Sequence, residues 1–133
     1  MTRYIIDASV AVECLLETAV GRSVRQMIAH EEVAAPTLLD AEVLAALRKG
    51  AQQGRVTTPQ AERAIADLIA WPIDRVPNRE LLPLAWRYRH NVTAYDALYV
   101  ALANSLGVPL LTIDGPLSRA SGIDIVVQNV RLA

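Results

Sequence analysis

The 133 residues, 53% of them hydrophobic, suffice for the core of one ordinary domain, and the net charge of −1 provides no general positive field for attracting nucleic acid. The single cysteine, Cys14, excludes an internal disulfide and a thiolate metal cluster. An acid at position 7 argues against a signal peptide, and no uncharged apolar run is long enough for a membrane span, so we expect a soluble, cytoplasmic protein.

Strand and helix patterns alternate along the chain. In the first half, strands are predicted at Arg3–Ile6 and Val33–Ala35, and helices at Ala8–Glu17, Gly21–His30 and from Pro36 to Gly50 or Gly54. In the second half, helices are predicted at Thr58–Ala70, Arg79–His90 and Ala94–Leu106, and strands at Ile73–Val76, Pro109–Ile113 and Asp124–Val127. Strands separated by helices indicate a parallel sheet covered on both faces, so we expect one α/β domain spanning residues 1–133.

Two aspartates directly follow predicted strands. Asp7 comes after Tyr4–Ile6, and Asp114 comes after Leu110–Ile113. In open parallel sheets, ligands bind in the crevice beyond the carboxyl ends of the strands, so these two acids are expected to be neighbours in space. Each also has a simpler interpretation, since Asp7 could cap the helix that follows it and Asp114 could form a turn with Gly115.

Two further acids lie in predicted helices that are otherwise largely apolar. Glu42 falls within the apolar arc of its helix, and Asp96 is the only charged residue between Thr93 and Leu106. A carboxylate on a core-facing side costs free energy unless a partner compensates it. Here too simpler interpretations exist, because Glu42 could be partly exposed or paired with Lys49, and the spacing from Thr93 to Asp96 matches a capping box.

A bound divalent cation would account for all four carboxylates together. Clustered acids repel one another, and an ion of opposite charge removes that conflict. A set of oxygen ligands, with no cysteine or histidine at ligand spacing, favours Mg²⁺ or Mn²⁺ over zinc. Such ions activate water and neutralise phosphate charge during phosphodiester hydrolysis. Composition and periodicity by themselves leave the simpler interpretations open.

Three segments resemble motifs of the PIN-domain family and, more narrowly, of the VapC toxins of bacterial toxin–antitoxin pairs. The opening IIDASV resembles that family's strand-end aspartate, and LLDAEVLAALRKG resembles its glutamate-bearing helix, here preceded by Pro36. The segment TAYDALYVALANSLGVPLLTID is similar to the family's S/T-x-x-D-A helix and the strand that ends in T-x-D. The resemblance runs from Tyr4 to about Val127 and implies a three-layer α/β/α fold around a short parallel sheet of four to five strands.

The resemblance also implies a metal-dependent endoribonuclease whose catalytic acids are Asp7, Glu42, Asp96 and Asp114. Asp7 and Asp96 would be the chief ligands of Mg²⁺ or Mn²⁺, and Asp114 would complete the shell. Glu42 would bind the metal through water or orient the attacking water. Hydroxyl groups would support these acids from the outer shell, namely those of Ser9, Thr93 and Thr112.

One departure from the family pattern bears on the number of metal ions. Many relatives carry a further acid shortly after the position of Asp114, whereas this chain has Gly115, Pro116 and Leu117 there. A second tightly bound metal is therefore not expected.

The same resemblance implies partners. Family members act as homodimers, bind a VapB-type antitoxin whose tail blocks the active site, and cut structured RNA such as transfer or ribosomal RNA; operator DNA is contacted only through the antitoxin. Arg48 and Lys49, one to two helical turns after Glu42, could contact RNA, although basic residues near a helix C-terminus are common. A basic middle segment could also touch RNA, with a solvated face as the favoured interpretation; it comprises Arg75, Arg79, Arg87 and Arg89. Tyr95 and Tyr99 are expected in the core, with stacking on a base as the alternative.

Other functions remain as alternatives. A PIN nuclease outside toxin–antitoxin pairs would keep the same acids, whereas an interaction module without catalysis is disfavoured because degenerate members usually lose one or more of them. A phosphoryl-transfer enzyme with an acidic Mg²⁺ pocket fits poorly, because position 9 is a serine and the only lysine is Lys49.

Overall fold

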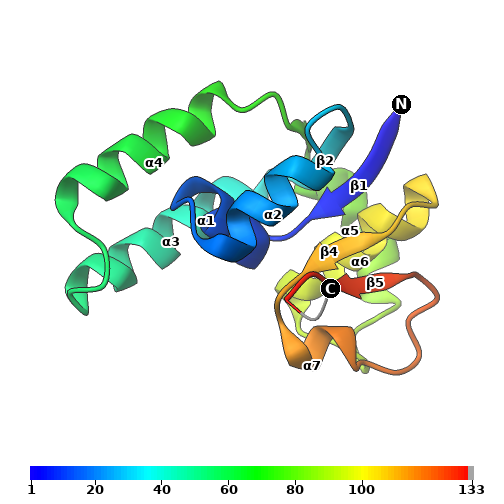
Figure 1. Ribbon diagram of the computed structural model, residues 1–133. Helices are drawn as coiled ribbons and strands as arrows, with labels where there is room; N and C mark the ends of the chain where they lie inside the picture. Colours follow the sequence, from blue (N-terminus) through cyan, green and yellow to red (C-terminus); the bar gives the residue numbers. More distant parts are fainter. Residues whose placement is uncertain (132–133) are drawn as a thin grey trace.

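The computed structural model describes residues 1–131 and contains a five-stranded parallel sheet between two layers of helices (Figure 1). The strands are β1 Thr2–Ile6, β2 Glu32–Pro36, β3 Asp74–Val76, β4 Leu110–Thr112 and β5 Val127–Asn129. The helices are α1 Ala8–Leu15, α2 Ala19–Met27, α3 Leu38–Gln52, α4 Thr58–Ala70, α5 Asn78–Trp86, α6 Ala94–Leu106 and α7 Gly115–Ser118. The expected α/β class is confirmed. Within residues 1–131, no helix combines the length and apolarity needed to cross a bilayer.

The strand order places β1 at the centre of the sheet. The order is β3-β2-β1-β4-β5, and β1 pairs in parallel with β2 on one side and with β4 on the other. The first three strands follow one another from the centre of the sheet to one edge, and β4 then lies on the opposite side of β1. Open α/β sheets bind ligands at such a reversal, beyond the carboxyl ends of the strands. The residues that follow β1 and β4 therefore lie where a site is expected.

Helix α6 has the predicted bounds because both of its ends carry strong local signals. The hydroxyl of Thr93 accepts a hydrogen bond from the backbone N–H of Asp96 at 3.2 Å, which satisfies one of the unpaired donors of the first turn. Gly107 follows the last turn with a φ of 67°, a left-handed conformation that glycine adopts without strain.

Local signals also set the ends of other elements. Helix α4 has the predicted bounds, Thr58–Ala70, and its N-cap, Thr57, forms a reciprocal capping box with Gln60. Helix α2 begins earlier than predicted because the Thr18 side chain caps it. Helix α1 ends before Glu17, whose φ of 56° cannot continue a right-handed helix.

Two predictions in the second half of the chain were wrong. The last strand is Val127–Asn129 rather than Asp124–Val127, because its position is set by pairing with β4, where Leu110 lies opposite Val127. The helix predicted over Arg79–His90 ends at Trp86, and the short helix α7 was not predicted.

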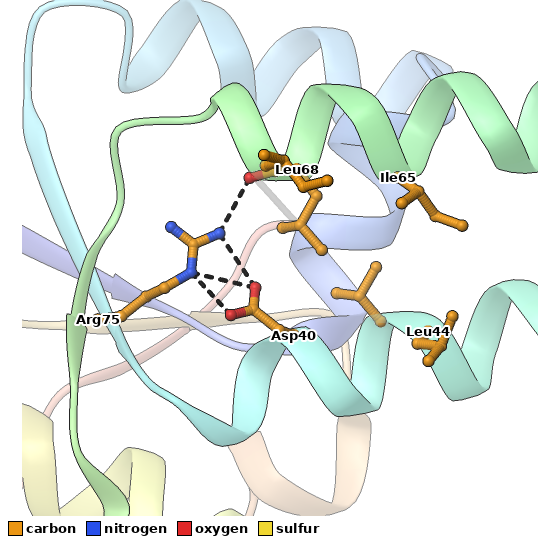
Figure 2. A pocket seen from close by; sticks show the side chains of 7 residues that line it. Asp40, Leu44, Ile65, Leu68 and Arg75 are labelled. Carbon is orange, nitrogen blue, oxygen red and sulfur yellow. Dashed lines mark hydrogen bonds and ion pairs between the residues drawn. The ribbon is translucent and has the colours of Figure 1, made fainter.

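An ion pair ties β3 to the α3–α4 hairpin (Figure 2). The Nε of Arg75 donates to Asp40 of α3 at 2.8 Å, and a terminal nitrogen of Arg75 donates both to Asp40 at 3.0 Å and to the carbonyl of Leu68 at 2.9 Å. The other terminal nitrogen reaches the carbonyls of Trp71 and Ile73. The Leu68 carbonyl lies in the last turn of α4, where intrahelical donors run out, so Arg75 both pairs a charge and closes a helix end.

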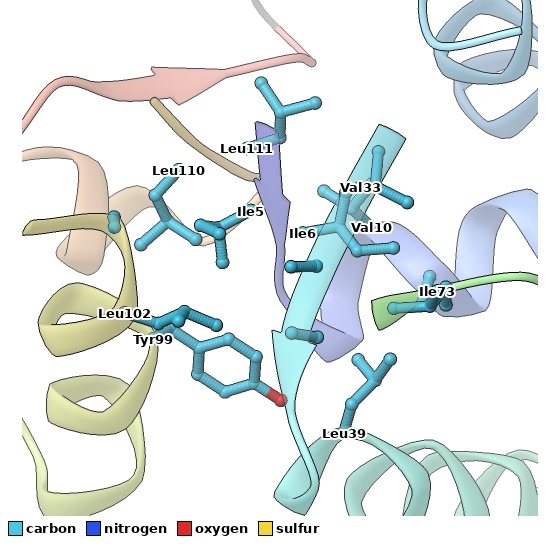
Figure 3. Close-up of a cluster of buried hydrophobic side chains, with 14 of the residues drawn as sticks. Ile5, Ile6, Val10, Val33, Leu39, Ile73, Tyr99, Leu102, Leu110 and Leu111 are labelled. Atoms are coloured by element: carbon cyan, nitrogen blue, oxygen red, sulfur yellow. The ribbon is translucent and has the colours of Figure 1, made fainter. Parts of the chain in front are cut away.

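The core lies between the central strands and the helices on either side. Figure 3 shows its most buried side chains around β1 and β4, among them Ile5, Ile6, Val10, Tyr99, Leu102, Leu110 and Leu111. The ring of Tyr99 is 1% exposed, as predicted, and its hydroxyl oxygen points toward α3. The same prediction was wrong for Tyr95, which is 61% exposed because nothing in the described part of the chain covers the start of α6 on that side.

We expect Arg75→Met to lower the free energy of unfolding by about 1–3 kcal/mol, because it leaves Asp40 without its cation and removes one of the two donors to the Leu68 carbonyl, the other being the backbone N–H of Trp71. Urea denaturation followed by circular dichroism measures the change. The exposed Arg63 of α4 supplies the control, since Arg63→Met should change stability by less than about 0.5 kcal/mol. Equal stability of the two variants would contradict the role of Arg75.

Candidate active site

Asp7 is a buried carboxylate at the carboxyl end of β1. It is 5% exposed, and its Oδ1 accepts hydrogen bonds from the backbone N–H of Val10 at 3.1 Å and from the hydroxyl of Ser9 at 2.5 Å. Its Oδ2 accepts a hydrogen bond from the hydroxyl of Thr112. The contact with Val10 caps α1, so Asp7 does serve as an N-cap. Capping occupies only one of its oxygens and does not by itself explain the burial.

The hydroxyls of Ser9 and Thr112 join the ends of β1 and β4. They lie 3.4 Å apart. Ser9 also accepts from the backbone N–H of Ile113 at 3.2 Å, and Thr112 accepts from that of Asp114 at 2.9 Å. Each hydroxyl therefore accepts from the backbone and donates to Asp7, which fixes the direction of its proton. This is the arrangement that an outer-shell support of a metal-binding carboxylate requires.

Glu42 is a half-buried residue of α3 that is held by a neutral donor. The hydroxyl of Tyr99 in α6 donates to Glu42 Oε1 at 2.6 Å. Within residues 1–131, no ion pair joins Glu42 to Lys49, so that alternative interpretation of Glu42 was wrong. The sequence analysis placed Tyr99 in the core but missed this hydrogen bond, because no local pattern links residues so far apart in the chain.

Asp96 and Asp114 are half-buried at the starts of two helices. Asp96 lies in the first turn of α6, and Asp114 caps α7 by accepting the N–H of Leu117 at 3.4 Å. The turn considered for Asp114 and Gly115 is thus the first turn of a short helix. Thr93, the third expected outer-shell hydroxyl, caps α6. The positive end of the α6 dipole favours the negative charge of Asp96.

The four carboxylates influence one another electrostatically. Burial raises the pKa of Asp7 to about 6, hydrogen bonds to the carboxylate oppose the increase, and the charge of Asp96 adds to it. Burial also raises the pKa of Glu42, with the Tyr99 hydroxyl opposing and the charge of Asp96 adding. Asp96 itself has a pKa raised by burial and by the charge of Asp114. Asp96 therefore interacts electrostatically with each of the other three acids.

The donor set fits a hard divalent cation. All of the candidate ligands are oxygens, and the buried, mutually repelling carboxylates are groups whose ionised forms a cation would stabilise. Among residues 1–131, no group of three or more Asp, Glu, His or Cys side chains is arranged so that it could hold a metal ion. Mg²⁺ usually takes one or two carboxylates and keeps several waters, so two of these acids suffice for such an ion.

Two grooves border the acids, and each carries an arginine. One groove of about 490 Å³ is lined by Ser9 and Glu42 and also by Arg55. The other, of about 400 Å³, is lined by Asp96 and Arg89. The guanidinium of Arg89 is also 4.8 Å from the ring centre of Trp86, within the range of a cation–π contact.

Arg55 is not among the basic residues that the sequence analysis considered, and Arg89 is one for which it favoured a solvated face. Arg48 and Lys49 line neither groove, whereas Arg55 lies in the groove with Glu42 and Arg89 in the groove with Asp96. No local pattern indicated Arg55, which follows the turn after α3.

Comparisons with known proteins agree with this geometry. The chain matches the PIN domain family over residues 4–123. It is 41% identical to ribonuclease VapC1 of Mycobacterium tuberculosis, over 98% of this chain and 100% of VapC1.

Solved structures that share its fold include VapC20 and VapBC2. VapC20 of Mycobacterium tuberculosis, a sarcin-ricin loop cleaving toxin, is 18% identical with a TM-score of 0.66, over 92% of this chain and 98% of VapC20. VapBC2 from Rickettsia felis, bound to a DNA fragment from its promoter, matches with 12% identity and a TM-score of 0.65, over 96% of this chain and 98% of the matched chain. Together with the family match and the relationship to VapC1, the shared fold leads to one conclusion: this chain belongs to the PIN-domain family and, within it, to the VapC ribonucleases.

Proposed function

We propose that this chain is the toxin of a VapBC-type toxin–antitoxin pair and an endoribonuclease that depends on Mg²⁺ or Mn²⁺. The observation that carries the proposal is the buried carboxylate of Asp7, which lies at the end of β1 beside the end of β4 and is repelled by the charge of Asp96. In a domain that only bound a partner, the repulsion between these carboxylates would destabilise the fold without serving a function. The relationship to VapC1, a ribonuclease, supports the activity.

Each acid has a role that its surroundings support. Asp7 and Asp96 would hold the ion, and Asp114 would complete the shell. Ser9 and Thr112 keep Asp7 oriented by donating to its two oxygens. When bound, the ion lowers the pKa of a coordinated water and neutralises charge on the phosphate.

Glu42 has a separate role in this proposal. One of its oxygens is held by the hydroxyl of Tyr99, and the other would orient the attacking water.

We propose structured RNA, transfer or ribosomal, as the substrate. VapC20 shares the fold and cleaves the sarcin-ricin loop, which supports an RNA of this kind. Because the net charge is −1, attraction of the phosphate backbone depends on local cations. Arg55 and Arg89 border the acids and are suited to this role, and Arg48 and Lys49 remain candidates for contacts further along α3.

We also propose a homodimer formed through α5 and α6. Leu82 and Trp86 of α5 and Tyr95 of α6 are 56%, 67% and 61% exposed, and they line one groove of about 400 Å³. Exposed apolar side chains gathered in one place mark an interface, and large aromatic residues are typical of the centres of such interfaces. A second copy related by a two-fold axis would cover this surface with the same surface.

The antitoxin would bind a different apolar surface. Leu44 and Ile69 are 57% and 78% exposed and line a groove of about 440 Å³ between α3 and α4, which can accept the apolar face of a helix (Figure 2). Because α3 also carries Glu42, a VapB-type antitoxin docked there would have its tail within reach of the acids. Operator DNA would be contacted through the antitoxin, in line with the promoter-bound VapBC2.

The purified chain, freed of antitoxin, should cleave RNA in Mg²⁺ or Mn²⁺ and stop when EDTA is added. Asp7→Asn and Asp96→Asn should each lower the rate at least about 100-fold, because each removes a charge that the ion requires. Gel analysis of a labelled RNA measures the rate. The exposed Asp67 of α4 is the control, and Asp67→Asn should stay within about twofold of the wild type. Full activity in both active-site variants would exclude the mechanism.

The metal-free protein should be less stable above pH 6 than the Asp7→Asn variant. The pKa of Asp7 is about 6 in the folded protein and 3.8 ordinarily, so folding favours the protonated acid. That contribution is complete below about pH 4 and is lost as the pH rises through 6, which amounts to up to about 3 kcal/mol at pH 7.5. Urea unfolding in EDTA at pH 4 and pH 7.5 measures both proteins. A variant that is less stable at pH 7.5 would show that Asp7 carries no such cost.

Trp86→Glu should convert the dimer to a monomer, because it buries a charge in the proposed contact between copies. Sedimentation equilibrium gives the mass of the assembly. Ile69→Glu, on the α3–α4 surface, should leave the dimer intact and weaken antitoxin binding. Dissociation of the dimer by Ile69→Glu alone would reverse the assignment of the two surfaces.

A further inference from the structure

The hydroxyl of Tyr99 holds the carboxylate of Glu42 from inside the core. Its ring is 1% exposed, and its hydroxyl donates to Glu42 Oε1 at 2.6 Å. We infer that Tyr99 is a positioning residue, which fixes one oxygen of Glu42 so that the other faces the reacting water. This inference rests on the proposed ribonuclease function and adds a residue to it.

Because Tyr99 lies in α6, its hydroxyl connects Asp96 of the same helix with Glu42 of α3. Asp96 lies three residues before Tyr99 in α6, and side chains at this spacing share a helix face. Asp96 and the Tyr99 hydroxyl are therefore fixed relative to one another by the helix backbone. The hydrogen bond from Tyr99 fixes the position of Glu42, which lies in α3, relative to α6 as well.

Packing around the ring holds the Tyr99 hydroxyl in a fixed position. The ring lies among fully buried side chains, and Leu102, one turn further along α6, lies beside it (Figure 3). A ring enclosed in this way loses little further freedom when its hydroxyl bonds Glu42, whereas a donor on a flexible surface side chain would lose more.

The chemical type of the donor also suits the site. A phenol holds a carboxylate oxygen without adding positive charge. A lysine or arginine in its place would neutralise Glu42 and weaken the negative potential that attracts a divalent ion. A neutral donor therefore orients Glu42 and leaves its charge available.

Tyr88 provides a matched case without the proposed role. It is 4% exposed, and its hydroxyl donates to Asp124 at 2.5 Å. Asp124 lies in the loop before β5 and belongs to none of the grooves that contain the acids. Both tyrosines are buried and donate their hydroxyl to a carboxylate, but Asp124 is exposed, so removing the Tyr88 hydroxyl should cost no more stability than removing that of Tyr99. Only the loss of the Tyr99 hydroxyl should affect catalysis.

The test compares Tyr99→Phe with Tyr88→Phe in the full-length protein. Tyr99→Phe should lower kcat for RNA cleavage about 10- to 100-fold and leave KM within about twofold, because it displaces Glu42 without removing an RNA contact. Tyr88→Phe should keep kcat within about twofold. Thermal melts of both variants confirm folding. Unchanged kcat in Tyr99→Phe, or an equal loss in Tyr88→Phe, would overturn the inference.

Two further measurements separate positioning from general support of the fold. In a Glu42→Gln background, adding Tyr99→Phe should change kcat by less than about twofold, since the group that it positions is already altered; an undiminished loss would overturn the inference. A crystal structure of Tyr99→Phe should show the Glu42 carboxylate displaced and Asp7 unmoved, and an unmoved Glu42 would also overturn it. A wild-type protein that cleaves no RNA would instead reject the proposed function.

Discussion

The burial of one carboxylate at the end of the central strand governs the organisation of this site. Asp7 is 5% exposed, and an ionised group in that position costs free energy unless its oxygens are bonded. The bonds come from Ser9 just beyond β1 and from Thr112 at the end of β4. Because Thr112 reaches Asp7 only when β4 pairs with β1, the sheet topology and the stability of this carboxylate depend on each other. A bound cation would compensate the negative charge that remains on Asp7.

The remaining acids approach Asp7 from separate helices, so their positions are set by the packing of those helices on the sheet. Glu42 comes from α3, Asp96 from α6 and Asp114 from the start of α7. Side chains on rigid elements keep their geometry better than side chains on loops. Like charges held in this way reduce the stability of the metal-free protein, a cost that proteins commonly carry at sites that need a particular charge.

Features with a local cause could be predicted from the sequence, and features with a long-range cause could not. Helix α6 was predicted with its observed bounds because Thr93 and Gly107 mark its ends. The last strand was displaced in the prediction because its register depends on β4, and the spacing of apolar residues does not encode that pairing. The four acids could be singled out because a carboxylate stands out in an apolar segment, whereas their joint role as a metal site stays a prediction. The bond between Tyr99 and Glu42 was not, because its partners meet only after α3 and α6 have packed on the sheet.

The two edge strands of the sheet limit how this chain can associate with other molecules. β3 and β5 are three residues long, and each is covered along one side by its only neighbour, β2 or β4. Short edges present little unpaired backbone, so they discourage the strand-to-strand addition through which many sheets aggregate. An interface with another chain is therefore expected to use side chains on helices. Substitutions of those side chains can then change which partner is bound, without disturbing the strand pairing that holds Asp7 in place.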